Sequence, residues 1–224
     1  MKAGAAAITC AVLAGAAALW AWSPLTSRTV AKPARVPQVQ SVGTKTTEIS
    51  DAGVPKQGRL FLTKDQLAQA IASGTLDRPV KSLLAVQRPL YFGDYQWNDR
   101  GVPAGPTWIR VDLGSQLISV FRAGHEIGTA VIVYGGENKQ TPAGKLHILG
   151  KDRDHRSSLY DAQMPYTLRL TGDGVSIHAS NVRWGAATHG CIGVPFPFAE
   201  RLFNAAKLGD EVVVVGSPPR RTMS

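Results

Sequence analysis

Cysteine is scarce in this chain of 224 residues, and its scarcity limits the chemistry that the chain can use. Only Cys10 and Cys191 are present, and Cys10 lies inside an apolar N-terminal segment. We therefore expect no intrachain disulfide, and the Cys-x2-Cys pairs of structural zinc sites are absent. Cys191 is the only thiol in the body of the chain. A buried, inert cysteine is the common case, so the neighbours of Cys191 decide whether it has a function.

Acidic residues are also few, with 16 Asp and Glu against 25 Lys and Arg, which gives a formal charge of +9. The basic residues are scattered, and no basic run is longer than Arg220-Arg221. The sequence contains no RNA-binding signature, zinc-finger spacing or basic helix, so we do not expect nucleic acid as a partner. A basic balance also suits an anionic wall polymer or anionic lipid.

The first 23 residues have the composition of a segment that directs export. Lys2 precedes an uncharged apolar run over residues 3–22, which as a helix would span roughly 30 Å, about the thickness of a hydrocarbon core. This pattern predicts a signal peptide or an uncleaved signal anchor over 1–23. We expect an exported protein of the periplasm or cell envelope, attached to the inner membrane by residues 3–22 if they are not cleaved.

A linker and a small extension are predicted next. Residues 24–57 are rich in Pro, Ser, Thr, Val and Lys without a usable period, which is typical of a flexible linker. Residues 58–106 predict a small N-terminal extension with one short helix over 64–73, where Thr63 caps the start and Gln66 completes a capping box. The rest of the extension contains four prolines and predicts irregular structure, apart from a short strand near 83–86.

From residue 107 the hydrophobic pattern changes to the alternation of β-strands. Turn residues separate closely spaced strands, which predicts antiparallel pairing. A helix is predicted over 197–207, and residues 217–224 form a tail. The result is a mostly β (α+β) domain over 107–216 with one or two short helices. The predicted strands are 108–113, 117–122, 126–134, 145–149, 166–170, 175–178 and 211–215.

Two histidines lie near Cys191 in the sequence. A cysteine that attacks a carbonyl needs a base, because a free thiol has a pKa of about 8.5 and is mostly protonated at neutral pH. His178 lies 13 residues before Cys191, at the end of a predicted strand, and His189 lies two residues before it. Gly190 would let backbone N–H groups approach a substrate oxygen. These residues predict thiol catalysis.

Two other interpretations stay open from these residues alone. His178, His189 and Cys191 could bind zinc, with Asp173 as a fourth ligand. Alternatively, both histidines are hydrogen-bonded structural residues and Cys191 fills a small space in the core.

The histidine and cysteine segments together resemble the signature of the L,D-transpeptidase catalytic domain (YkuD type). That signature is a histidine, a variable loop and then Ser/Thr-His-Gly-Cys. The resemblance extends over about 107–216 and implies a β-sandwich of mixed sheets. The matching segments are Ile177-His178, Thr188-His189-Gly190-Cys191-Ile192, Val111-Asp112-Leu113, Thr141-Pro142-Ala143-Gly144 and Met164-Pro165-Tyr166.

The resemblance assigns roles to individual residues. It implies that Cys191 is the nucleophile, that His178 is its base, and that the backbone carbonyl of Ala179 orients His178. His189 and Gly190 would shape the pocket wall, and the N–H groups of Gly190 and Cys191 would form an oxyanion hole. No metal or organic cofactor is implied. The candidate substrate-binding residues in and near these segments are Tyr166, Arg183 and Thr188.

The resemblance also implies a substrate. Family members cleave the bond after the third residue of a peptidoglycan tetrapeptide stem and release D-alanine. The acyl group then passes to an amine, which forms a 3→3 cross-link or attaches a protein. Carbapenem-type inhibitors acylate the same cysteine. The alternatives are a hydrolase that uses the same acyl-enzyme, and a wall-binding module without catalysis.

Two features depart from the family pattern. Gly193 stands where the family usually has an arginine, two residues after the cysteine. We hypothesise that Arg183, in the loop between His178 and Cys191, supplies the missing positive charge. That loop is also shorter than in many family members, which would alter the choice of substrate or expose the acyl-enzyme to water.

Overall fold

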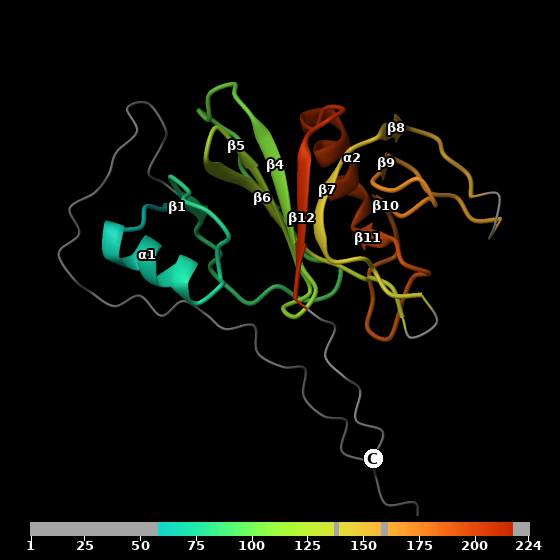
Figure 1. Cartoon of the computed structure of the whole chain (residues 1–224), viewed down its shortest axis with the longest axis horizontal. Coiled ribbons are helices and arrows are strands. Elements are labelled where there is room, and N and C mark those ends of the chain that lie inside the picture. The colour runs from blue at the N-terminus through green and yellow to red at the C-terminus, as the bar shows by residue number, and fades with distance from the viewer. Residues whose placement is uncertain (1–57, 137–138, 158–160, 217–224) are drawn as a thin grey trace, which may run out of the picture. The chain divides into compact units, whose positions relative to one another are not determined.

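The computed structural model describes residues 58–136, 139–157 and 161–216 (Figure 1). The predicted signal segment 1–23, the linker 24–57 and the tail 217–224 lie outside the described residues. All described residues belong to one compact unit. Within these residues, neither helix has the length and apolar character that crossing a membrane requires.

The described residues are mostly β, with mixed sheets and two short helices, which confirms the predicted fold class. The helices are α1 (Lys64–Ala72) and α2 (Phe196–Ala205). The strands are β1 (Arg59–Leu60), β2 (Leu83–Leu84), β3 (Tyr95–Trp97), β4 (Thr107–Asp112), β5 (Leu117–Arg122), β6 (His125–Val131), β7 (Gly144–His147), β8 (Gly150–Asp152), β9 (Thr167–Arg169), β10 (Ser176–Ala179), β11 (Ile192–Val194) and β12 (Glu211–Val215).

The larger sheet has six strands in the order β3-β6-β5-β4-β12-β7. Most neighbours are antiparallel, as the closely spaced strands predicted, but β12 returns to pair parallel with β4. The alternation predicted for β4 is present, with Ile109 and Val111 fully buried on the core side. On the other side of β4, Trp108 stacks on Phe121 at 4.2 Å.

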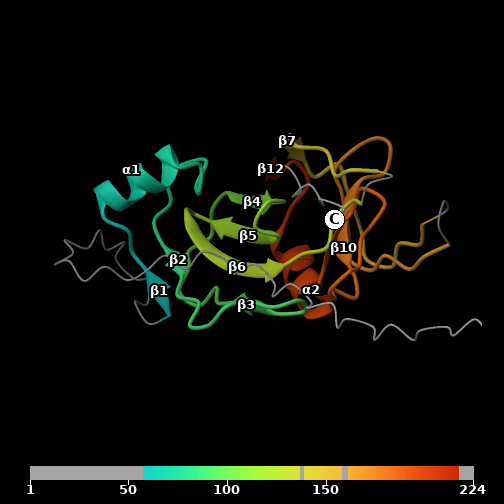
Figure 2. The same cartoon turned by 90° about the horizontal axis from the view of Figure 1, so that it is seen from below.

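The smaller sheet has four strands in the order β11-β10-β9-β8, and it carries the residues of chemical interest. Its apolar side chains join those of the larger sheet and of α2 in a single core. Figure 2 shows α2 between β6 and β10. Within this core, Ile177, Ile192 and Phe198 have at most 1% of their surface exposed. The smaller sheet is therefore held against α2 by close packing.

Both helices follow their sequence signals. Thr63 and Gln66 form the predicted capping box, each side chain accepting a hydrogen bond from the other residue's backbone N–H. α2 begins with Pro197 in its first turn and ends at Ala205, two residues earlier than predicted, because Ala206 is already extended.

Sequence periodicity did not predict four short strands, which are β1, β3, β8 and β11. Strands of two or three residues are too short to show a hydrophobic period.

Within the extension over 58–106, β1, α1 and β2 lie at the side of the larger sheet away from β10 (Figure 2), and β3 forms an edge strand of that sheet. The buried Arg59 guanidinium donates hydrogen bonds to Ser82 Oγ at 3.2 Å and to the Glu126 carbonyl of β6 at 2.7 Å. The extension also reaches the loop between His178 and Cys191, where Phe92 packs edge-on against Trp184 at 5.6 Å. It therefore supports the sheet and that loop together.

Candidate active site

The parallel pair of β10 and β11 sets the geometry of the site. Ile177 pairs with Ile192, and His178 pairs with Gly193. Ile177 and Ile192 point into the core, so His178 and Cys191, each one residue away from them, fall on the opposite face of the sheet. Neighbours displaced by two residues on adjacent strands lie within reach of a long side chain. The fold thus places the predicted nucleophile and base on one face.

His178 is held in a defined orientation. Its Nδ1 lies 2.8 Å from the carbonyl oxygen of Ala179, the contact that the family resemblance implies. Because a carbonyl only accepts hydrogen bonds, Nδ1 carries the proton and Nε2 is left as the basic nitrogen. Burial lowers the pKa of His178, with a smaller lowering from His155, while the hydrogen bond to Ala179 opposes this shift. The imidazole is therefore neutral at rest and able to accept a proton.

Cys191 is partly buried in the wall of a cavity. Burial raises the pKa of its thiol, and a backbone hydrogen bond from Ser176 and the charge of Lys139 offset part of this increase. Its Sγ lies 3.8 Å from the carbonyl oxygen of Gly174. These shifts leave both the Cys191 thiol and the His178 imidazole neutral at rest. A neutral thiol needs a general base that takes its proton as the sulfur attacks.

The loop before Cys191 is fixed from two sides. Thr141 Oγ1 accepts a hydrogen bond from the Gly135 N–H at 2.9 Å and donates one to the Gly190 carbonyl at 3.0 Å. Thr188 Oγ1 donates to the carbonyl of Cys191. Gly190 has a φ of +97°, a conformation that L-residues rarely adopt. Thr141 and Thr188 therefore hold the loop that carries Cys191, contacts that the sequence motif did not reveal.

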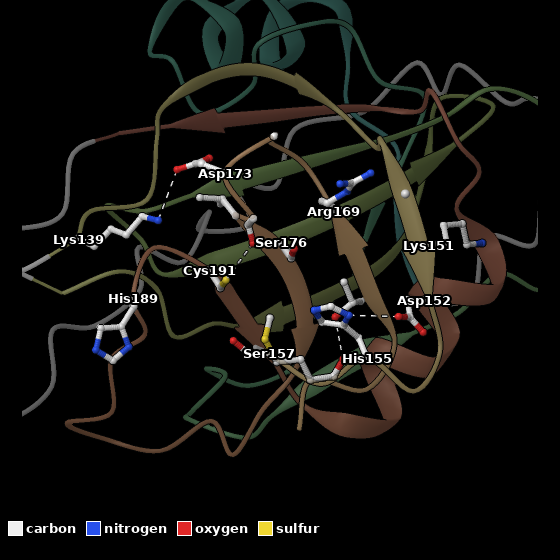
Figure 3. Close-up of a pocket in the computed structure, with 16 residues that line it drawn as sticks. Lys139, Lys151, Asp152, His155, Ser157, Arg169, Asp173, Ser176, His189 and Cys191 are labelled. Carbon is white, nitrogen blue, oxygen red and sulfur yellow. Dashed lines mark hydrogen bonds and ion pairs between the residues drawn. The ribbon is translucent and has the colours of Figure 1, made fainter. Parts of the chain in front are cut away.

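Figure 3 shows the cavity, which has a volume of about 570 Å³. Its wall combines the loop before β7, strands β8 and β9, the turn before β10, and the residues that lead into β11. Cys191 and His189 both line it. The described lining residues are Lys139, Gly150, Lys151, Asp152, His155, Ser157, Met164, Thr167, Arg169, Gly172, Asp173, Gly174, Val175, Ser176, His189 and Cys191.

None of the three predicted substrate-binding residues is among the described residues that line the cavity, and Thr188 uses its hydroxyl to donate to the Cys191 carbonyl. The ring of Tyr166 packs edge-on between Phe196 and Phe203 at 5.2 and 5.8 Å, so it belongs to the packing around α2. Arg183 is exposed on the loop that follows β10. Neither residue is among the described residues that line the cavity. The structure therefore does not support Arg183 as the substitute for the missing arginine, nor Tyr166 as a substrate contact.

Gly193 has no room for any side chain. A Cβ atom at this position would lie 2.7 Å from Ser180 Cβ and 2.7 Å from Val133 Cγ2. The backbone of Gly193 is also paired with that of Val133 through two hydrogen bonds of 2.8 and 3.0 Å. Ser180 and Val133 thus fill the space that a larger residue would need, which explains why this chain has no arginine there.

Apart from Asp173, which the zinc interpretation named, the charged residues in the cavity were not predicted. Lys139 Nζ lies 3.4 Å from Asp173 Oδ2, and His155 Nδ1 lies 3.1 Å from Asp152 Oδ2. Arg169 comes from β9, near the centre of the smaller sheet. These residues lie far from the His-Gly-Cys motif in sequence, and only the strand order brings them to it. Across the described parts of the chain, no cluster of three or more His, Cys, Asp or Glu could hold a metal ion.

Comparison with known proteins now identifies this domain. Residues 106–214 match the family model of the L,D-transpeptidase catalytic domain, YkuD. This stretch belongs to the YkuD family. The family expected from the sequence motifs is thereby confirmed, and both His178 and Cys191 lie within the matched stretch.

The chain spans about half the length of the curated relatives that it matches. L,D-transpeptidase 1 of Mycobacterium tuberculosis is 28% identical over 134 residues, which cover 52% of this chain and 53% of that protein. Among solved structures, an L,D-transpeptidase from Stackebrandtia nassauensis is 22% identical, with a TM-score of 0.49, over 68% of this chain and 66% of that one. L,D-transpeptidase 3 from M. tuberculosis, in complex with a faropenem-derived adduct, is 20% identical, with a TM-score of 0.45, over 56% and 78% of the two chains.

The neutral resting pair predicts how the thiol responds to pH. Because burial raises the pKa of Cys191, we expect its alkylation by iodoacetamide to accelerate with pH through a midpoint above the ordinary value of about 8.5. Mass spectrometry of the Cys191 peptide gives the rate. Lys139→Gln removes a charge that favours the thiolate, so its midpoint should be higher still, while Arg201→Gln on the exposed side of α2 should leave it unchanged. A midpoint below pH 7 would show a resting thiolate–imidazolium pair instead.

The crowding at Gly193 predicts a loss of stability on substitution. Gly193→Ala forces a Cβ against Ser180 and Val133, and we expect it to lower the free energy of unfolding by about 1–3 kcal/mol. Gly172→Ala is the matched control, since no atom lies within 4 Å of its Cβ position, and it should be neutral or slightly stabilising. Urea denaturation measures both. Equal stability of the two variants would contradict the packing described for Gly193.

Proposed function

We propose that the YkuD domain of this chain is a cysteine acyltransferase that acts on peptidoglycan tetrapeptide stems. The substrate carbonyl would belong to the third residue of the stem, and the leaving group would be D-alanine. The observation that carries the proposal is the placement of Cys191 and His178 on one face of the smaller sheet, with Nδ1 of His178 committed to Ala179. Nε2 is then left to act as the base.

The first half of the reaction forms the acyl-enzyme. Cys191 Sγ attacks the carbonyl carbon while its proton passes to Nε2 of His178. The resulting oxyanion would be stabilised by the backbone N–H groups of Gly190 and Cys191. The intermediate collapses by breaking the C–N bond to D-alanine, and the imidazolium returns the proton to the leaving amine. His178 is suited to both steps because its neutral form is favoured at rest.

The second half transfers the acyl group. An acceptor amine attacks the thioester carbon and gives its proton to His178. The C–S bond then breaks, the product amide leaves, and the cysteine sulfur regains the proton. With the amine of a second stem as acceptor, the product is a 3→3 cross-link. A lysine side chain as acceptor would attach a protein to the wall. A water molecule would release a tripeptide, and the enzyme would then be a hydrolase.

The rest of the chain fits an enzyme of the cell envelope. The uncharged run over 3–22 would direct export, and residues 24–57 would carry the domain away from the membrane if that run stays in place. The formal charge of +9 suits a substrate that carries carboxylates. Carbapenem-type inhibitors would acylate the same thiol, because they present a strained carbonyl to it.

The activity can be tested with the purified chain and a tetrapeptide donor, by measuring D-alanine release and cross-linked products with mass spectrometry. We expect Cys191→Ala to abolish both products. His178→Gln should slow turnover by about 100-fold or more, the usual contribution of a general base. Cys10→Ala is the matched control for loss of a thiol and should retain full turnover.

Other outcomes of this experiment separate the alternatives. D-Alanine release by the wild-type chain without any cross-linked product would identify a hydrolase. Binding to isolated wall without D-alanine release, and without a carbapenem adduct on Cys191, would identify a binding module and contradict the proposed activity.

A further inference from the structure

One row of residues crosses the smaller sheet on the face that carries Cys191. In β9, Arg169 pairs with Gly150 of β8 on one side and with Ser176 of β10 on the other. The parallel register of Ile177 with Ile192 puts Ser176 next to Cys191. Directly paired residues share a face of the sheet, so Arg169 and Cys191 lie on the same side. Two strand spacings separate them, which is about 10 Å between their Cα atoms.

The charged side chains of the cavity differ in what they already bind. Lys139 is paired with Asp173, and Asp152 with His155. The Lys151 ammonium donates to the carbonyls of Phe203 and Ala206, at the end of α2. In contrast, no described residue forms a hydrogen bond or ion pair with the guanidinium of Arg169. Among the described cations of the cavity wall, Arg169 is therefore the one available to a ligand.

The residue opposite Arg169 leaves space for its guanidinium. A Cβ atom at Gly150 would lie 3.3 Å from Arg169 Nε and 3.4 Å from one of its terminal nitrogens. The guanidinium thus lies across Gly150 on the cavity wall, and Figure 3 shows it extending from β9 toward β8. This arrangement places the five-donor fork on the cavity wall without using its donors.

We propose that Arg169 is a specificity-determining residue that binds a carboxylate of the donor stem; this rests on the proposed transpeptidase activity. The ligand class is a peptide whose carboxylate lies several bonds from the reacting carbonyl, bound by two parallel N–H···O bonds. The second residue of a stem and the side chain of a diaminopimelate third residue both offer such a group. Each lies about six or seven bonds from the carbonyl, roughly 7–9 Å when extended.

This role also accounts for the absence of an arginine at position 193. Gly193 pairs with His178, and Ser180 and Val133 occupy the space around it. A cation for the substrate therefore has to come from another strand. Arg169 provides one from two strands away, on the same face and in the same cavity.

The test compares kcat and KM of the full chain on three tetrapeptide donors. One has both carboxylates free, one has the second-residue carboxyl amidated, and one has lysine in place of diaminopimelate. We expect Arg169→Gln to raise KM for the first donor by about 10-fold or more, with a smaller change in kcat. For the donor that lacks the carboxylate bound by Arg169, wild type and Arg169→Gln should have the same high KM. The donor with this equal KM therefore identifies the carboxylate that Arg169 binds.

Three further variants make the result specific. Arg169→Lys keeps the charge but loses the fork, and should fall between wild type and Arg169→Gln. Arg183→Gln and Arg201→Gln each remove one exposed charge outside the cavity and should leave KM unchanged. Thermal melting checks that every variant is folded.

The inference and the proposed function fail in different ways. If the wild-type chain releases no D-alanine from any donor, the proposed function is wrong. If it turns over the donors but Arg169→Gln keeps the wild-type KM and the wild-type preference among them, the assignment of Arg169 is overturned.

Discussion

The site depends on the parallel pairing of β10 with β11. This register buries Ile177 and Ile192 in the core and thereby turns His178 and Cys191 to the opposite face. A slip of one residue would exchange the faces, placing the thiol in the core and an isoleucine in the cavity. Close packing of the two isoleucines against the core opposes such a slip. The hydrophobic core thus fixes the side of the sheet on which His178 and Cys191 lie.

Hydrogen bonds around this pair complete what the register begins. Ala179 fixes the tautomer of His178, and Thr141 holds the turn at Gly190, where the positive φ suits a glycine. Burial keeps both reacting groups neutral, because it raises the pKa of the thiol and lowers that of the imidazole. The extension over 58–106 also supports this region, because Phe92 packs on Trp184 within the loop between His178 and Cys191.

Local signals in the sequence predicted much of this structure. The capping box at Thr63, the alternation in β4 and the His178–Cys191 pair all depend on residues close together in the chain. The cavity wall could not be predicted in the same way, because Arg169 reaches Cys191 only through the pairing of three strands. The misplacement of Tyr166 and Arg183 has a related cause. Both lie near the motif in sequence, but their backbone turns them toward α2 and solvent.

The central claim is that Cys191 accepts an acyl group from a stem peptide, and intact-mass spectrometry tests it most directly. The purified chain would be mixed with a tetrapeptide donor, without acceptor, and quenched in acid at short times. The account predicts a mass increase equal to the donor minus D-alanine, located on the peptide that contains Cys191 and absent from Cys191→Ala. Two results would contradict it. One is release of D-alanine by the wild-type chain with no adduct on Cys191, and the other is an adduct on a different residue.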